Sequence, residues 1–169
     1  MPIIIASART IKHNILLHEK ACALRLYIHA MESFNKLTAT LIIVRGIPGS
    51  GKSTLAKKLC ALLGGAYYET DMFFEQTGEY IFDPTKLAEA HAWCFAKVKE
   101  SLASGKLTMV ANTFCQDAHM QPYMELASKH IIIQLNTSYG SVHNVPDYAV
   151  ERMKEQLKST TILPDITLG

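Results

Sequence analysis

Eight consecutive residues have the types and spacing of a loop that binds phosphate. They read Gly46-Ile47-Pro48-Gly49-Ser50-Gly51-Lys52-Ser53 and fit the spacing G-x-x-x-x-G-K-[ST], the P-loop. Glycines let the backbone turn tightly and leave its N–H groups free to surround an anion. The lysine suits the β- and γ-phosphates of a nucleotide, and the serine hydroxyl suits Mg²⁺. The residues expected to bind the nucleotide are Gly46, Pro48, Gly49, Ser50, Gly51, Lys52, Ser53 and Thr54.

The segments on either side of this loop have the required order. Residues 41–44 form a short apolar run that is typical of a buried parallel strand. After the loop, Leu55, Leu59 and Leu62 fall on one stripe of a helix predicted over 53–63. Such a helix directs its positive dipole end and its unpaired N–H groups toward the same anion. A chance glycine turn would not need this context, so we predict a site for ATP and Mg²⁺.

Strand and helix patterns alternate along the rest of the chain. Further strands are predicted at 66–69, 107–111 and 131–135, and helices at 84–105, 118–128 and 146–158. This alternation predicts an α/β fold, the three-layer sandwich of P-loop NTPases, with a mostly parallel sheet of four or five strands and helices on both faces. The pattern itself yields only four strands, one fewer than the usual five.

In parallel sheets of this kind, ligands bind beyond the carboxyl ends of the strands. Besides the P-loop, three segments follow predicted strands, namely Thr70-Asp71, Asn112-Thr113 and the irregular stretch 136–145. We therefore expect their side chains near the phosphates.

Several other side chains have two interpretations. His91 lies on an otherwise apolar helical face, where a histidine is more often a core residue than a substrate ligand. Phe73, Phe74 and Trp93 are able to stack on a base, but packing in the core explains them equally well.

The bulk properties are those of an ordinary folded domain. Of the 169 residues, 49% are apolar and 19% are charged, which favours one globular domain. No apolar run approaches the roughly 18 residues of a membrane-spanning helix, so we expect no membrane association. The four cysteines have no zinc or C-x-x-C spacing, which together with ATP use favours the cytoplasm. We expect a monomer.

The net charge of +2 is unevenly distributed. Residues 1–30 contain four basic and one acidic side chain, whereas residues 31–169 contain 13 basic and 14 acidic side chains. The larger part lacks the strong basic excess that marks many nucleic-acid-binding proteins. If the bound nucleotide donates a phosphoryl group to a hydroxyl acceptor, this balance slightly favours an acceptor that is small or short.

Four groups of segments together resemble a known family. They are RGIPGSGKSTLAKKL, ETDMFF with FDPTKLAEAHAWC, VANTF with MQPY, and SVHNVPDYAVERM, and they occur in family order over about residues 40–157. The chain resembles small P-loop kinases of the polynucleotide 5′-hydroxyl kinase type, which include short AAA-family ATP-binding proteins of bacteria and phages. The first segment alone is shared by many NTPases, and the four together are fairly specific.

The resemblance implies roles for several residues. Asp71 occupies the position of the carboxylate that accepts the proton of the attacking hydroxyl. Because the third strand ends at Asn112 and not at the aspartate of a usual Walker B sequence, Asp71 is also a candidate, with Ser53, to support Mg²⁺. The alternative for Asp71 is a solvated residue that caps a strand end. Asn112 would face the γ-phosphate or the acceptor, unless it only shapes a turn. Arg45 matches the family and would pair with Glu69 or Asp71.

The chain departs from this family in its lid. Members usually close a lid bearing arginines over the triphosphate, but the matching residues 139–144 contain no arginine. Arg152, in the helix that follows, is the candidate to replace this cation, so the expected catalytic residues are Lys52, Asp71 and Arg152. An ordinary surface position on that helix is the alternative for Arg152.

Residues 1–36 match nothing in this pattern. Residues 10–30 fit one amphipathic helix, and a mitochondrial presequence, a docking helix and an upstream extension before a start at Met31 all agree with the composition. We favour the last. The predicted division is an N-terminal extension at 1–36, disordered or loosely helical, a P-loop kinase-like domain at 37–160 and a tail at 161–169.

Two functions follow from these expectations. The first is a kinase that transfers the γ-phosphate of ATP to a hydroxyl acceptor, either a nucleic-acid 5′-hydroxyl or a small metabolite. The alternative is a nucleotide-binding regulatory module with little or no turnover, which would need the P-loop but no lid cation. An ATPase motor is disfavoured because the chain is short and has no clear second-motif aspartate.

Overall fold

The computed structural model describes residues 41–76, 78–140 and 145–169. These residues belong to one compact unit that runs from Ala39 to Gly169. The predictions for residues 1–36 and for lid residues 141–144 lie outside the described residues. In the described ranges, no helix has the length and apolar character needed to cross a membrane.

A five-stranded sheet forms the centre of this unit, and all its strand pairs are parallel. The strand order is β2-β3-β1-β4-β5. The strands are β1 (Leu41–Gly46), β2 (Ala66–Tyr68), β3 (Thr108–Ala111), β4 (His130–Leu135) and β5 (Ile166–Leu168). The helices are α2 (Lys52–Leu63), α3 (Leu87–Ala103), α4 (Asp117–Glu125) and α5 (Asp147–Lys158), with short 3-10 helices η1 (Thr70–Glu75) and η2 (Pro84–Lys86).

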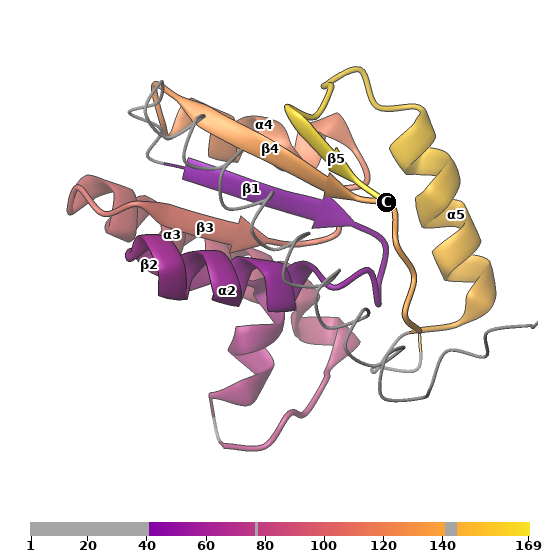
Figure 1. Ribbon diagram of the computed structural model, residues 1–169. Coiled ribbons are helices and arrows are strands. Elements are labelled where there is room, and N and C mark those ends of the chain that lie inside the picture. Colours follow the sequence, from indigo (N-terminus) through magenta and orange to yellow (C-terminus); the bar gives the residue numbers. More distant parts are fainter. Residues whose placement is uncertain (1–40, 77, 141–144) are drawn as a thin grey trace, which may run out of the picture. The chain divides into compact units, whose positions relative to one another are not determined.

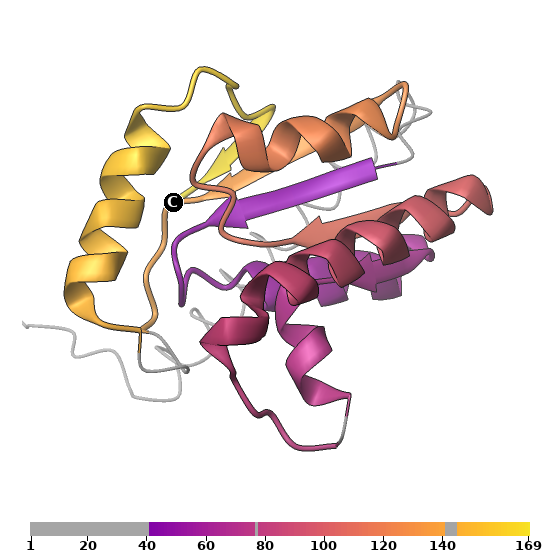
Figure 2. The ribbon, with the colours of Figure 1, turned by 180° about the vertical axis from the view of Figure 1, so that it is seen from behind.

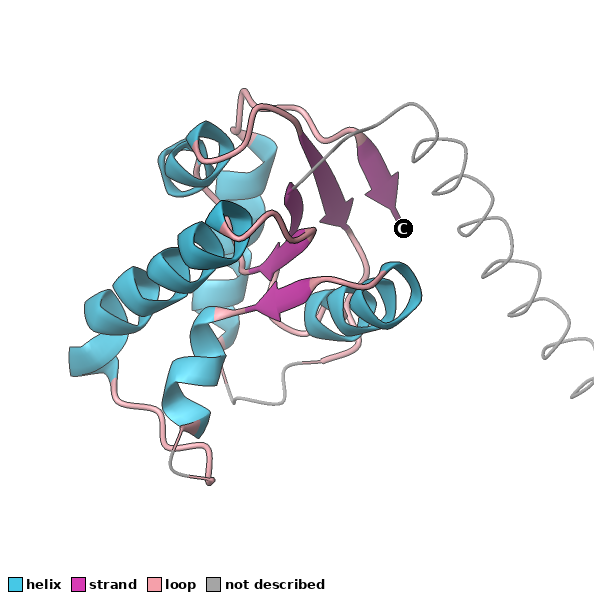
Figure 3. Ribbon diagram, turned by 90° about the vertical axis from the view of Figure 1, so that its left-hand side faces the viewer, coloured by secondary structure: helices cyan, strands magenta, loops and turns pink. Residues whose placement is uncertain are grey.

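Helices cover both faces of the sheet. α2 lies on one face (Figure 1), and the reverse view shows α3 and α4 on the other (Figure 2). In the view turned by 90°, the strands lie between helices on either side (Figure 3). The predicted three-layer α/β sandwich is therefore confirmed.

The central strand β1 is buried on both of its faces. Leu41 and Ile43 pack with residues of α3 and α4, whereas Ile42 and Val44 pack with residues of α2. Successive side chains of a strand point to opposite faces, so a strand between two helical layers needs an unbroken apolar run. This explains the Leu-Ile-Ile-Val sequence that precedes the P-loop.

The fifth strand corrects the sequence-based division of the chain. β5 lies in the stretch 161–169 that was set apart as a tail, and it pairs with β4 from Ile133↔Ile166 to Leu135↔Leu168. Just before β5, the Asp165 side chain accepts a hydrogen bond of 2.7 Å from the Ile132 N–H. A three-residue edge strand carries too little periodicity to be recognised alone, so the sequence pattern located only four strands of a sheet predicted to have four or five.

Arg45, on β1, is a buried structural residue. Its guanidinium donates to Gln134 Oε1 at 2.8 Å and to the Ile162 carbonyl at 2.9 Å. Burial lowers its pKa, and the nearby Asp117 partly offsets this effect. Arg45 therefore connects β1 to β4 and to the segment before β5. The expectation that it pairs with Glu69 or Asp71 is wrong.

Candidate nucleotide-binding site

Three P-loop glycines adopt backbone angles that only glycine reaches without strain, with φ of 154° at Gly46, 75° at Gly49 and 88° at Gly51. Gly46 is required for space, because a Cβ there would lie 2.6 Å from the Leu135 carbonyl oxygen. Gly51 caps α2 without a side-chain hydrogen bond, and the first turn of α2 holds no acidic residue. The first N–H groups of α2 thus remain available to an anion.

Lys52 lies over the loop. Its Nζ donates to the Ile47 carbonyl at 2.7 Å. Burial lowers the pKa of Lys52 to about 8, while Cys115, Asp71 and Glu69 act in the opposite direction. A cation in this poorly solvated position would gain strongly from a phosphate beside it.

Ser53 is held by a carboxylate that the sequence analysis did not select. Its hydroxyl donates to Oε2 of Glu69, the residue that follows β2, and Glu69 is only 7% exposed. Burial and the neighbouring Glu69 raise the pKa of Tyr67. The position of Glu69 in the sequence could have indicated a role in the site, because it is a carboxylate at the carboxyl end of a strand.

The donor set fits Mg²⁺. Hydroxyl and carboxylate oxygens are its usual protein ligands, and Mg²⁺ keeps several waters and substrate phosphate oxygens. In the described part of the chain, no group of three or more His, Cys, Asp or Glu side chains could hold a metal by itself. A metal here would accordingly depend on Ser53, Glu69 and the nucleotide.

Asp71 is half-buried in η1, two residues after Glu69. Its charge raises the pKa of Lys52, of Tyr80 and of His91, in each case after a larger effect of burial. Asp71 is thus within electrostatic range of the P-loop lysine, whereas the bond to Ser53 comes from Glu69.

The Asn112 side chain forms hydrogen bonds within the protein. Its Oδ1 accepts a 2.9 Å hydrogen bond from the Thr70 N–H, and its Nδ2 donates to Cys94 Sγ at 3.7 Å. This differs from the expectation that Asn112 faces the γ-phosphate or the acceptor. His91 is exposed on α3, so it is not a core residue, and its Nδ1 lies 3.2 Å from the Thr70 hydroxyl.

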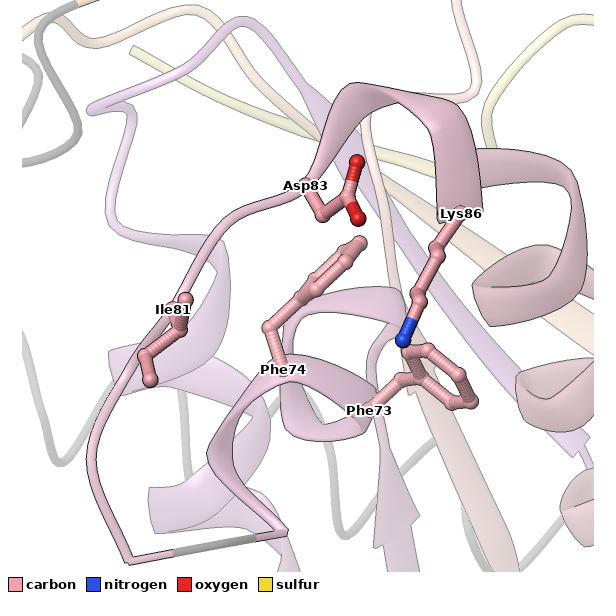
Figure 4. Close-up of a pocket in the computed structure, with 5 residues that line it drawn as sticks. All are labelled: Phe73, Phe74, Ile81, Asp83 and Lys86. Atoms are coloured by element: carbon pink, nitrogen blue, oxygen red, sulfur yellow. The ribbon is translucent and has the colours of Figure 1, made fainter.

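The aromatic residues after β2 pack on one another and border a cavity. Phe73 makes edge-to-face contacts with Phe74 and Trp93, at centroid distances of 5.4 and 6.2 Å. A cavity of about 230 Å³ opens beside them. Its lining residues, drawn in Figure 4, are Phe73, Phe74, Ile81, Asp83 and Lys86.

The segment after β4 runs along the P-loop. The Tyr139 N–H donates to the Gly49 carbonyl at 2.9 Å, and the Thr137 hydroxyl donates to the Ser50 carbonyl at 2.8 Å. The Arg152 side chain is exposed on α5 and makes no hydrogen bond or ion pair with another described residue.

Comparison with known protein families agrees with this geometry. Residues 41–142, which span the P-loop, Glu69, Asp71 and Asn112, match the family model described as an AAA domain. The chain belongs to the AAA domain family. The resemblance to short AAA-family proteins with a P-loop kinase fold is confirmed.

Relatives of this AAA domain include human NEDD4-binding protein 2, which is 40% identical over 93 residues, covering 53% of this chain and 5% of that protein. Shikimate kinase 2 of Yersinia pestis (strain Pestoides F) is 32% identical over 72 residues, covering 43% of this chain and 40% of that enzyme. The chain thus spans less than half the length of these relatives.

Two solved structures have the same fold. A sugar kinase from Janibacter sp. HTCC2649 has a TM-score of 0.57 at 16% identity, covering 77% of this chain and 84% of that chain. A chain of the Pnkp1/Rnl/Hen1 RNA repair complex has a TM-score of 0.56 at 18% identity, covering 71% and 44% respectively. At these identities the likeness concerns the fold alone.

Proposed function

We propose that this AAA domain is a kinase that uses ATP and Mg²⁺ to phosphorylate a hydroxyl acceptor. The observation that carries the proposal is the arrangement around Ser53. One carboxylate, Glu69, binds the serine, and a second, Asp71, lies within electrostatic range of Lys52. A module that only binds nucleotide needs the first of these carboxylates but has no use for the second.

We assign Glu69 and Ser53 to the metal, and Asp71 chiefly to the acceptor. Bound Mg²⁺ would neutralise charge on the β- and γ-phosphate oxygens. Lys52 and the loop N–H groups bind the phosphates. Asp71 orients the acceptor hydroxyl and takes its proton as the new O–P bond forms and the bond to the ADP oxygen breaks.

Arg152 is proposed as the cation that the lid lacks. It is the sixth residue of α5, about 8 Å along the axis from the start at 1.5 Å per residue, and a long side chain can extend back toward the helix start. Its exposed position and its lack of another described partner are compatible with binding a phosphate.

The acceptor would lie on the side of η1. The cavity next to Phe73 and Phe74 begins two residues after Asp71 on the same 3-10 helix. A nucleic-acid 5′-hydroxyl and a small polyol or hydroxy acid both remain candidates. We also propose that the protein is a monomer and acts in the cytoplasm.

The test is ATP consumption and phosphorylated-product formation with a panel of acceptors. The panel holds a 5′-hydroxyl oligonucleotide, a nucleoside 3′-phosphate, gluconate and shikimate. We expect one class to stimulate turnover in the parent protein and not in the Lys52→Ala variant, which should remain folded but lose ATP binding. ATP binding by the parent without acceptor-dependent turnover would favour the regulatory module instead.

A further inference from the structure

Thr70 lies between the two carboxylates and is held from two sides. It is only 5% exposed. Its N–H donates to Asn112 Oδ1 at 2.9 Å, and its hydroxyl lies 3.2 Å from His91 Nδ1. Asn112 follows β3 and His91 lies on α3, so two separate elements converge on this residue.

These two contacts act where the chain changes direction. Glu69 is extended, with φ −144° and ψ 156°, and Thr70 is the first residue of η1. The Met72 N–H then donates to the Glu69 carbonyl at 3.2 Å. A short 3-10 helix has weak hydrogen bonds of its own, so side-chain contacts at its first residue largely decide its orientation. Fixing Thr70 therefore fixes how Asp71 leaves the backbone, whereas Glu69 is held separately by its hydrogen bond from Ser53.

The surroundings of His91 suit an imidazole that accepts this hydrogen bond. Partial burial and His119, on α4, lower the pKa of His91, while Asp71, on η1, raises it. A neutral imidazole accepts at Nδ1 when its proton is on Nε2, and the threonine hydroxyl is then the donor.

We propose that His91 is a positioning residue of the kinase, acting through the Thr70 hydroxyl to orient Asp71 toward the acceptor. This role rests on the function proposed above. His91 does not itself need to touch the acceptor or the phosphates. Its effect should therefore appear in the rate of the acceptor-dependent step and not in ATP binding.

The chain offers variants that separate the two imidazole nitrogens. The amide of His91→Asn replaces the Nδ1 acceptor, whereas the longer His91→Gln carries its amide near the position of Nε2. We expect His91→Ala and His91→Gln to lower the acceptor-dependent kcat about 5- to 10-fold, the rate equivalent of one hydrogen bond. The KM for ATP should stay within about twofold, because the P-loop is unchanged. His91→Asn should recover most of the loss.

A double-mutant cycle tests the connection to Thr70. Thr70→Val keeps the shape and removes the hydroxyl, so it should lower kcat as much as His91→Ala, and the double variant should lose no more than either single variant. Thr70→Ser should retain activity. His119→Ala is the matched control, because this histidine neighbours His91 but has no hydrogen bond to Thr70 among the described residues.

Each contrary result has a defined meaning. If the His91→Ala and Thr70→Val losses multiply in the double variant, or if His91→Asn is no better than His91→Ala, the positioning role is wrong. If the variants lose thermal stability without a change in kcat, His91 is structural only. If the parent has no acceptor-dependent turnover, the proposed function fails, and the role of His91 fails with it.

Discussion

Glu69 and Asp71 leave the same strand end two residues apart but have different neighbours. Glu69 is buried against the Ser53 hydroxyl, and Asp71 is half-buried with its charge acting on Lys52 and Tyr80. Two carboxylates in different environments can serve different steps of one reaction. At the residue scale, this difference supports the proposed division between a metal-side group, Glu69, and an acceptor-side group, Asp71.

This separation predicts different kinetic defects. Glu69→Gln should raise the Mg²⁺ concentration needed for half-maximal activity, because a neutral amide attracts the cation less than a carboxylate does. Asp71→Asn should lower kcat by about 10²-fold, the scale of a lost general base, with little change in ATP affinity. Measuring the activity of both variants over a range of Mg²⁺ concentrations checks both expectations. An unchanged magnesium requirement in Glu69→Gln would contradict the metal assignment.

The lowered pKa of Lys52 predicts a pH dependence of stability. Its pKa is about 8 in the folded protein, against 10.5 for an unperturbed lysine such as that of the unfolded chain. Between these two pKa values, Lys52 binds more protons in the unfolded chain than in the folded protein. The contribution of Lys52 to the free energy of unfolding therefore rises with pH in this window, and it is constant at lower pH. Urea unfolding from pH 7 to 10 should show this rise in the parent relative to Lys52→Met. The exposed Lys58→Met should show the same profile as the parent.

At the scale of elements, β2 must approach β3 closely for its end to carry Glu69 to Ser53. Gly65, just before β2, has φ 108°, and a Cβ there would lie 2.1 Å from the Leu107 carbonyl oxygen. Gly64 has φ 73° but open space around it. Substituting Gly64 therefore tests backbone strain alone, whereas substituting Gly65 tests backbone strain together with steric exclusion.

Substituting these two glycines should destabilise the protein to different degrees. Gly64→Ala should lower the free energy of unfolding by about 1–3 kcal/mol, the cost of a strained backbone angle. Gly65→Ala should cost more, because β2 must also move away from the Leu107 carbonyl. Urea denaturation measures both changes, and equal losses would show that the close approach is unimportant.

Arg152 lies on the helix α5, and the role proposed for it predicts how its substitution changes kcat. If its side chain reaches the transferred phosphoryl group, Arg152→Ala should lower kcat at least about tenfold, and Arg152→Lys should recover only part because a lysine cannot form paired hydrogen bonds. Lys154→Ala, which removes a surface pair of 2.6 Å with Glu151 on the same helix, is the control. Equal activity of Arg152→Ala and the parent would leave Arg152 as a surface residue.

At the scale of the whole molecule, residues 1–30 are predicted to be dispensable. They differ in charge from the rest of the chain and match none of the family segments. A protein that begins at Met31 should be soluble, unfold at the same temperature and bind ATP as the full chain does. Thermal unfolding and ATP titration check this, and a lower unfolding temperature would show that the removed residues contribute to the fold.

The P-loop and the fold class could be predicted from the sequence alone. The P-loop is contiguous, and it works through backbone groups whose geometry follows from glycine spacing and the helix that begins at Lys52. The run from Leu41 to Val44 likewise reports burial on two faces without any knowledge of its neighbours. These features depend on residues close together in the chain, so periodicity and composition reveal them.

Only the tertiary structure decided which side chains meet. Glu69 reaches Ser53 across 16 positions, Asn112 reaches Thr70 across 42, and Arg45 reaches Ile162 across 117. A hydrogen bond between distant residues depends on strand order and register, which bring specific carboxyl ends together, and no local pattern encodes that alignment. For the same reason β5 was missed, because its three residues become a strand only through their pairing with β4.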